Sequence, residues 1–159
     1  MNCGPAAGAM IGRACGYGEG LSDVQLVEKL ADIGLTDESG TTGNGMIAIY
    51  EEMGLETAAI PGVDMSWINS QLAAGHYVTA LGDYYAVPGR VDDSQSAGHY
   101  MDVTAYEAAT QAQAARYSVA DPANEALKYL SIMELKSFVN SAPNGGGFCI
   151  SCWEAAAVL

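Results

Sequence analysis

The first fourteen residues constrain the fold of this chain most, because they combine small residues with a proline placed to start a helix. Pro5 suits the first turn, where its missing N–H would have no partner, and alanines continue the helix to Ala14. Glycine recurs at Gly4, Gly8 and Gly12. These glycines let neighbouring backbone approach closely. The segment predicts a central helix packed on all sides against a sheet, with Cys3 at its N-terminus.

Cys3 gains a special environment from this position. A helix N-terminus carries partial positive charge and unpaired N–H groups, and an adjacent imidazolium lowers a thiol pKa further, from roughly 8.5 toward ~3.5–7.5. Cys3 would then be ionised at neutral pH. Taken alone, however, Cys3 is also compatible with an unreactive, buried cysteine. A base elsewhere in the chain decides between the two.

The chain has two histidines, His76 and His99, and each lies in a Gly-His-Tyr triplet that enters an apolar run. Both therefore open predicted strands. His99 is the favoured base because the next predicted strand, Ala115 to Ala120, ends at Asp121. An antiparallel pair of strands would bring that carboxylate against the imidazole and fix its tautomer.

Asp121 has competitors for this role. The Asp121-Pro122 pair also fits a simple turn at the end of a strand. Asn124 is an alternative orienting group, since an amide accepts the same hydrogen bond. Asp102 is less favoured, because period-two alternation points it to the opposite side of the strand from His99.

These residues resemble the papain-like cysteine peptidases, in particular the bacterial branch related to the double-glycine leader peptidases of bacteriocin exporters. The matching elements occur in the same order and cover most of the chain: Asn2 to Ala6, Gly40 to Met46, Glu56 to Ile60, Gly98 to Val103, and Asp121-Pro122. The resemblance implies that Cys3 is the nucleophile, His99 the general base and acid, and Asp121 the residue that orients His99.

One departure from the family concerns the oxyanion site. Papain-like enzymes carry a glutamine about six residues before the nucleophile, and here only Met1 and Asn2 precede Cys3. Loss of one such donor costs ~10² to 10³ in turnover. Three explanations are open. The side chain of Asn2, Gln25 or Asn44 acts as the second donor beside the Cys3 N–H; the chain is a fragment of a longer product; or its activity is feeble.

Capping and periodicity predict the remaining elements. Helices are expected from the Ser22-x-x-Gln25 capping box to Gly34, from about Gly45 to Gly54, from Asp64 to Gly75, and after the Ser131-x-x-Glu134 box; strands are expected near Glu56 to Ile60 and Gly147 to Trp153. Helices first and strands later indicate an α+β, papain-like fold. Its helical half carries Cys3 and packs on an antiparallel sheet that carries His99 and Asp121.

One long connection, Asp83 to Ala97, runs directly into the predicted His99 strand. It either covers the cleft between the two halves or is a solvated hairpin loop. Tyr84 and Tyr85 at its base either contact substrate or only pack.

Length and net charge limit the classes of partner that this chain can bind. A chain of 159 residues, half of them apolar, fits a single domain over residues 1–159. Its apolar runs fall far below the ~20 residues that span a bilayer, and its N-terminus lacks the pattern of a signal peptide. A net charge of -13 repels nucleic acid and anionic membranes. We expect a peptide or protein substrate; oligomeric state and localisation stay open.

The four cysteines also allow a different interpretation, in which Cys3, Cys15, Cys149 and Cys152 together bind a zinc ion. Residues three apart on a strand face opposite sides, which disfavours both a shared metal and a disulfide between Cys149 and Cys152. Cys3 and Cys15 lie about three turns apart on one helix, too far for a disulfide. We therefore expect four free thiols, no metal and no cofactor.

The resulting hypothesis is a cysteine peptidase that cleaves a peptide or isopeptide bond through a thioester on Cys3. The family resemblance offers several settings: leader-peptide removal, peptidoglycan cross-bridge cleavage, self-processing of a larger polypeptide, or attack on a host protein. Two alternatives remain. One is a catalytically silent module that holds a peptide in its cleft, and the other is an acyltransferase, in which an amine or thiol captures the thioester.

Overall fold

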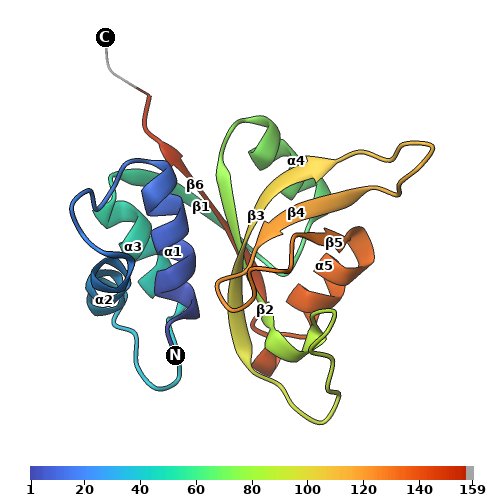
Figure 1. The fold of residues 1–159 in the computed structure, drawn as a ribbon, viewed down its shortest axis with the longest axis horizontal. Coiled ribbons are helices and arrows are strands. Elements are labelled where there is room, and N and C mark those ends of the chain that lie inside the picture. Colours follow the sequence, from blue (N-terminus) through green and yellow to red (C-terminus); the bar gives the residue numbers. More distant parts are fainter. Residues whose placement is uncertain (157–159) are drawn as a thin grey trace.

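The computed structural model describes residues 1–156, which form five α-helices and a six-stranded sheet (Figure 1). The helices are α1 (Cys3–Ala14), α2 (Asp23–Ile33), α3 (Gly43–Glu52), α4 (Met65–Ala73) and α5 (Ile132–Asn140). The strands are β1 (Leu55–Pro61), β2 (Tyr77–Asp83), β3 (Gly98–Glu107), β4 (Arg116–Ala120), β5 (Tyr129–Ser131) and β6 (Phe148–Glu154). Two 3₁₀ turns, η1 (Tyr84–Ala86) and η2 (Pro143–Gly145), lie in connections.

The strand order is β1-β6-β2-β3-β4-β5, and every neighbouring pair is antiparallel. The last strand along the chain, β6, is therefore inserted between β1 and β2. Three helices precede the first strand, as the sequence predicted. The fold is α+β, with the helices segregated from an antiparallel sheet.

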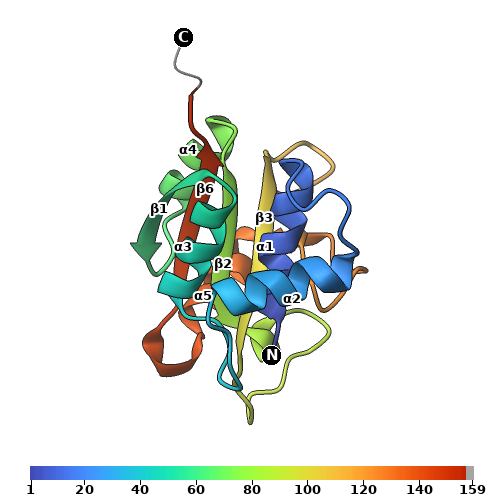
Figure 2. The same ribbon diagram turned by 90° about the vertical axis from the view of Figure 1, so that its left-hand side faces the viewer.

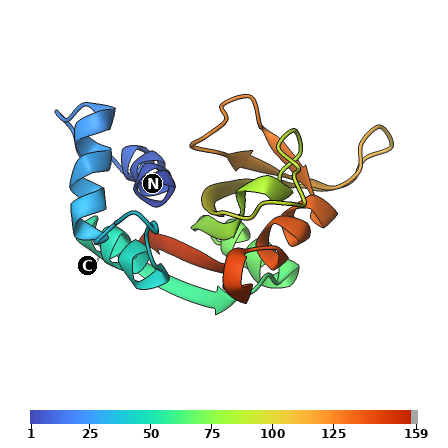
Figure 3. The same cartoon turned by 90° about the horizontal axis from the view of Figure 1, so that it is seen from below.

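Helices cover both faces of the sheet (Figures 1 and 3). Helices α1 to α3 gather on one side, where Ile150 and Cys152 of β6 join their apolar core, and Figure 2 views the sheet through these helices. Helices α4 and α5 share the other core with Cys149. Cys149 and Cys152 thus face opposite sides, as the period of a strand requires, and all four cysteines are free.

Side-chain caps fix the helix starts. Both predicted capping boxes form, at Ser22 with Gln25 and at Ser131 with Glu134. Asp64 caps α4 by accepting from the Trp67 N–H at 3.0 Å. Helix α3 begins slightly earlier than predicted, because the Thr42 hydroxyl accepts from the Gly45 N–H at 3.0 Å and sets the first turn.

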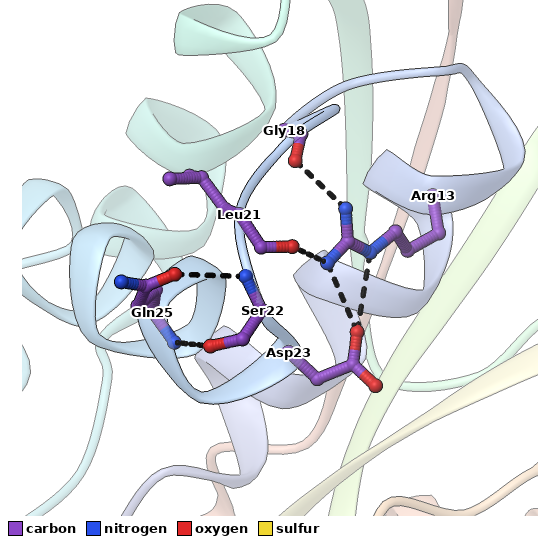
Figure 4. A network of polar contacts seen from close by, with 6 residues as sticks. All are labelled: Arg13, Gly18, Leu21, Ser22, Asp23 and Gln25. Atoms are coloured by element: carbon purple, nitrogen blue, oxygen red, sulfur yellow. Dashed lines mark hydrogen bonds and ion pairs between the residues drawn. The ribbon is translucent and has the colours of Figure 1, made fainter.

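The connection between α1 and α2 is tied to the end of α1 by Arg13 (Figure 4). Its guanidinium donates to the carbonyl oxygens of Gly18 and Leu21 at 2.8 and 2.6 Å and pairs with Asp23 at 3.0 Å. The two carbonyl bonds hold the turn that brings α2 back along α1. The Asp23 carboxylate is almost fully exposed, so the ion pair itself contributes little.

Helix α1 is closely packed, with no exposed residue from Cys3 to Gly12, but its neighbours are α2, α3 and β3 rather than the sheet alone, which the sequence predicted. Its glycines face α3 and the segment before it rather than the sheet: a Cβ on Gly8 would lie 2.9 Å from Ile49 Cγ2, and one on Gly4 would lie 2.8 Å from Thr41 Oγ1. Another side of α1 contacts β3. Only Arg13 and Ala14 are exposed, at the C-terminal end of α1. Within residues 1–156, no helix has the length and apolarity needed to cross a membrane.

Candidate active site

Cys3 is the first residue of α1, where the sequence predicted it. It opens onto a cleft of about 520 Å³ between the N-terminal helix and the sheet half of the molecule. Three segments line this cleft: Met1, Asn2, Cys3 and Ala6; Tyr84, Tyr85, Ala97, Gly98 and His99; and Pro122 with Ala123. Segments far apart along the chain thus meet around the sulfur of Cys3.

His99 and Asp121 are brought together by the pairing of β3 with β4. Ala120 pairs with Asp102, so Asp121 leaves the end of β4 on the side where β3 begins. His99 Nε2 lies 2.7 Å from Asp121 Oδ1, and both side chains are buried. The carboxylate accepts a hydrogen bond from the Nε2–H group, which leaves Nδ1 as the ring nitrogen available to Cys3.

Cys3 and His99 interact as an acid and a base. Burial raises the pKa of Cys3, but hydrogen bonds with the His99 side chain and the Tyr100 backbone lower it more, so the net pKa falls below that of an ordinary thiol. Burial lowers the pKa of His99, while hydrogen bonds with Asp121 and Cys3 raise it to a net value above the ordinary one. Opposite shifts favour the thiolate–imidazolium pair over the neutral pair.

Asp121 is held as an anion. Burial raises its pKa, but the hydrogen bond from His99, the Ala123 N–H at 2.8 Å and Arg90 together bring the pKa below the ordinary value. Arg90 Nη2 lies 2.5 Å from Asp121 Oδ2, the oxygen that His99 does not use. Sequence reasoning missed Arg90, because it lies in an irregular loop where neither spacing nor periodicity marks a functional residue.

The competing candidates lie elsewhere. His76 Nδ1 is 2.8 Å from Gln71 Oε1, and its ring stacks on Trp153 at 4.3 Å. Asn124 accepts from the Ala126 N–H within a local turn. Asp102 accepts from the Thr79 hydroxyl at 2.6 Å in the core, apart from the His99–Asp121 pair.

The three candidate oxyanion donors are also separated. Asn2 lines the cleft beside Cys3, and its side chain makes no capping bond to α1. The Gln25 side chain is used in the capping box of α2, as Figure 4 shows. Asn44 lies in the first turn of α3, outside the residues that line the cleft. Asn2 is the one of the three next to the sulfur.

The Asp83 to Ala97 connection forms one wall of the cleft through Tyr84, Tyr85 and Ala97. The Tyr84 ring meets the His99 ring edge to face, with centroids 5.3 Å apart. The connection thus lies against the cleft, which favours the first of its two interpretations.

The cysteines predicted as an alternative zinc set are not gathered in one place. Cys149 and Cys152 lie in different cores, and Cys15 lies at the opposite end of α1 from Cys3. Across residues 1–156, no three His, Cys, Asp or Glu side chains form a group that could hold a metal ion.

Comparison with known proteins identifies the fold. No family model matches the sequence, and no curated protein is significantly similar to it. Among solved structures, it is similar to the peptidase domain of Streptococcus ComA, a bifunctional ABC transporter involved in a quorum-sensing pathway, with a TM-score of 0.58 and 20% identity over 97% of this chain and 92% of that one. It is also similar to a putative C39-like peptidase from Bacillus anthracis, with a TM-score of 0.66 and 12% identity over 98% of this chain and 90% of that one. The chain therefore has the papain-like fold of C39 peptidase domains, as its motifs predicted.

Proposed function

We propose that this protein is a cysteine peptidase in which Cys3 is the nucleophile, His99 the general base and acid, and Asp121 the residue that orients His99. The observation that carries the proposal is that Cys3 and His99 line the same cleft, with His99 Nε2 hydrogen-bonded to the buried Asp121 carboxylate at 2.7 Å. The shifts of the Cys3 and His99 pKa values support an ionised pair ready for attack.

The reaction follows from these roles. The Cys3 thiolate attacks the carbonyl carbon of a peptide or isopeptide bond, and the carbonyl oxygen takes the negative charge. His99 gives its proton to the departing amine as the C–N bond breaks, which leaves a thioester on Cys3. Neutral His99 then takes a proton from water, the resulting hydroxide attacks the thioester, and Cys3 leaves as thiolate. We assign the Cys3 N–H at the start of α1 and the Asn2 amide as donors to the developing oxyanion, because both residues line the cleft.

A peptide or protein is the substrate class we favour. The cleft is open and lined mainly by apolar and aromatic side chains, which suits an extended chain better than a small polar molecule. The net charge of -13 would attract a cationic peptide and repel nucleic acid. We further propose that the chain forms a single domain, since both of its cores share one sheet, and that peptidoglycan cross-bridges belong to the substrates it cleaves.

A mixture of synthetic peptides of varied sequence, read by mass spectrometry, tests the proposal. The wild type is expected to generate cleavage products, and Cys3→Ala is expected to generate none. Cys15→Ala is the matched control, because that thiol lies at the far end of the same helix and is expected to leave cleavage unchanged. Equal cleavage by wild type and Cys3→Ala would contradict the assignment of the nucleophile.

The same mixture with added hydroxylamine or glycine amide separates hydrolysis from acyl transfer. Products that carry the added amine show that a thioester forms, and their share gives its partition: mainly free carboxylate at millimolar glycine amide indicates a hydrolase, and mainly amide indicates a transferase. Peptide binding without either product would favour the silent module.

A further inference from the structure

Arg90 is one of only six Lys and Arg residues in the chain, and its side chain is largely buried at the back of the candidate site. Nη2 contacts Asp121 Oδ2 at 2.5 Å. The centre of the guanidinium lies 4.1 Å from the centroid of the Tyr84 ring, and Tyr84 in turn meets the edge of His99. Arg90 thus touches two of the groups that surround His99.

The surroundings of Arg90 make a purely structural role a poor explanation. Within residues 1–156, its Nε and Nη1 are buried and have no hydrogen-bond partner. Burying a charge with most of its donors unused is costly. The cost is offset mainly at Asp121, whose side chain is fully buried and which already accepts from His99 and the Ala123 N–H.

We propose that Arg90 is a positioning residue that keeps Asp121 ionised and aimed at His99, and that its positive charge sets the pH range in which the Cys3–His99 ion pair exists. The inference rests on the proposed function, because it describes how that same ion pair is controlled. Because Arg90 belongs to the loop that carries Tyr84, Tyr85 and Ala97, the same contact also anchors the cleft wall to Asp121.

The sign of the effect follows from charge alone. Removing a positive charge makes nearby acids harder to ionise and makes nearby bases hold their protons longer. Loss of Arg90 therefore shifts the pH profile of Cys3 reactivity to higher pH. On its acid limb, Cys3 and Asp121 ionise at higher pH, and on its alkaline limb, His99 stays protonated to higher pH. Arg90 and His99 contact the two oxygens of one carboxylate at 2.5 and 2.7 Å, so the two cations lie roughly 7 Å apart, and at an effective dielectric constant of ~20 the expected displacement is about one to two pH units.

The charged and titratable groups around His99 come from several elements. Cys3 comes from α1, Tyr84 from η1, Asp121 follows β4, Arg90 lies in the loop, and on β2 Asp83 accepts from the backbone N–H groups of Tyr85 and Ala97. From α5 comes Phe138, which is uncharged. Arg90 is the one permanent cation in this set, so its removal is not masked by a neighbour.

The test is the rate of Cys3 alkylation by iodoacetamide as a function of pH, measured by peptide mass spectrometry in the wild type, Arg90→Gln, Arg90→Met and Arg90→Lys. Arg90→Gln keeps a donor for Asp121 without the charge, and Arg90→Met is a second neutral variant. Both are expected to move the acid and alkaline limbs up by about one to two pH units. Arg90→Lys keeps the charge but not the planar contact with Tyr84, and is expected to move the limbs much less than either neutral variant.

Arg116→Gln is the matched control. Arg116 also pairs with a carboxylate, Glu107 at 2.7 Å, and also lies over a tyrosine ring, Tyr129 at 3.4 Å, but it lies at the far end of β4. The pH profile of Cys3 alkylation in Arg116→Gln is expected to coincide with that of the wild type. Neutral Arg90 variants that lose stability or rate while their limbs stay in place would overturn the inference, as would limbs that move equally in Arg90→Lys. A wild type whose Cys3 reacts no faster than the other cysteines would overturn the proposed function as well.

Discussion

Asp102 is expected to destabilise the protein at neutral pH, and its replacement by asparagine is expected to stabilise it. The carboxyl is buried in the core, where Oδ1 accepts from the Thr79 hydroxyl at 2.6 Å and that hydroxyl lies 2.5 Å from the Tyr50 hydroxyl. Within residues 1–156, Oδ2 has no partner. Burial raises the pKa of Asp102 to about 8. The folded protein therefore holds this group neutral at pH 7.

The magnitude follows from linkage. The unfolded chain titrates Asp102 near 3.8, so the folded state binds the extra proton throughout the window from about 4 to 8. Stability falls as pH rises through this window, because the folded state binds more protons than the unfolded state. At ~1.36 kcal/mol per pKa unit, the penalty is about 4 kcal/mol at pH 7 and under about 2 kcal/mol at pH 5. Asparagine has the shape of the protonated acid and does not ionise, so Asp102→Asn removes this penalty.

Urea unfolding followed by tryptophan fluorescence at pH 5 and pH 7 measures the effect in the wild type and Asp102→Asn. Exposed Asp93 supplies the control, Asp93→Asn, which is expected to change stability by less than ~0.5 kcal/mol at either pH. The gain from Asp102→Asn must grow with pH. If Asp102→Asn raised the free energy of unfolding equally at the two pH values, or lowered it as much at pH 7 as at pH 5, the explanation by ionisation would be refuted.

Two further substitutions test packing and capping. Gly82→Ala is expected to cost more than about 2 kcal/mol in urea unfolding, because the new Cβ would lie 2.4 Å from the Phe138 carbonyl oxygen, whereas Gly146→Ala meets nothing closer than 3.4 Å and is expected to cost under about 1 kcal/mol. Equal losses in the two variants would mean that the close approach at Gly82 is unimportant. Ser131→Ala removes the side chain that caps α5 and is expected to lower stability by about 1 kcal/mol, so an unchanged unfolding midpoint would count against the capping box.

Local chemistry explains why most of the fold could be predicted. Caps at Ser22, Asp64 and Ser131 act within one helical turn, so their residues carry the signal themselves. The His99–Asp121 pair could also be predicted, because two adjacent antiparallel strands place their ends together.

The failures involve contacts that depend on tertiary packing. The glycines of α1 indicated a close approach but not its partner, which is α3 and the segment before it rather than the sheet. Strand β5 has three residues, too few for a period to appear. Arg90 lies in a loop, and its pairing with Asp121 spans 31 positions along the chain. No pattern in the sequence indicates such a contact.

The selective reactivity of Cys3 tests the central claim most directly. Iodoacetamide at about pH 5.5 is expected to alkylate Cys3 far faster than Cys15, Cys149 or Cys152, because only Cys3 has a pKa held below that of an ordinary thiol, while burial raises the other three. His99→Ala is expected to abolish this preference, and His76→Ala, which alters a histidine stacked on Trp153, is expected to preserve it. Four cysteines that react at equal, slow rates in the wild type, or a fast Cys3 that survives His99→Ala, would contradict the account.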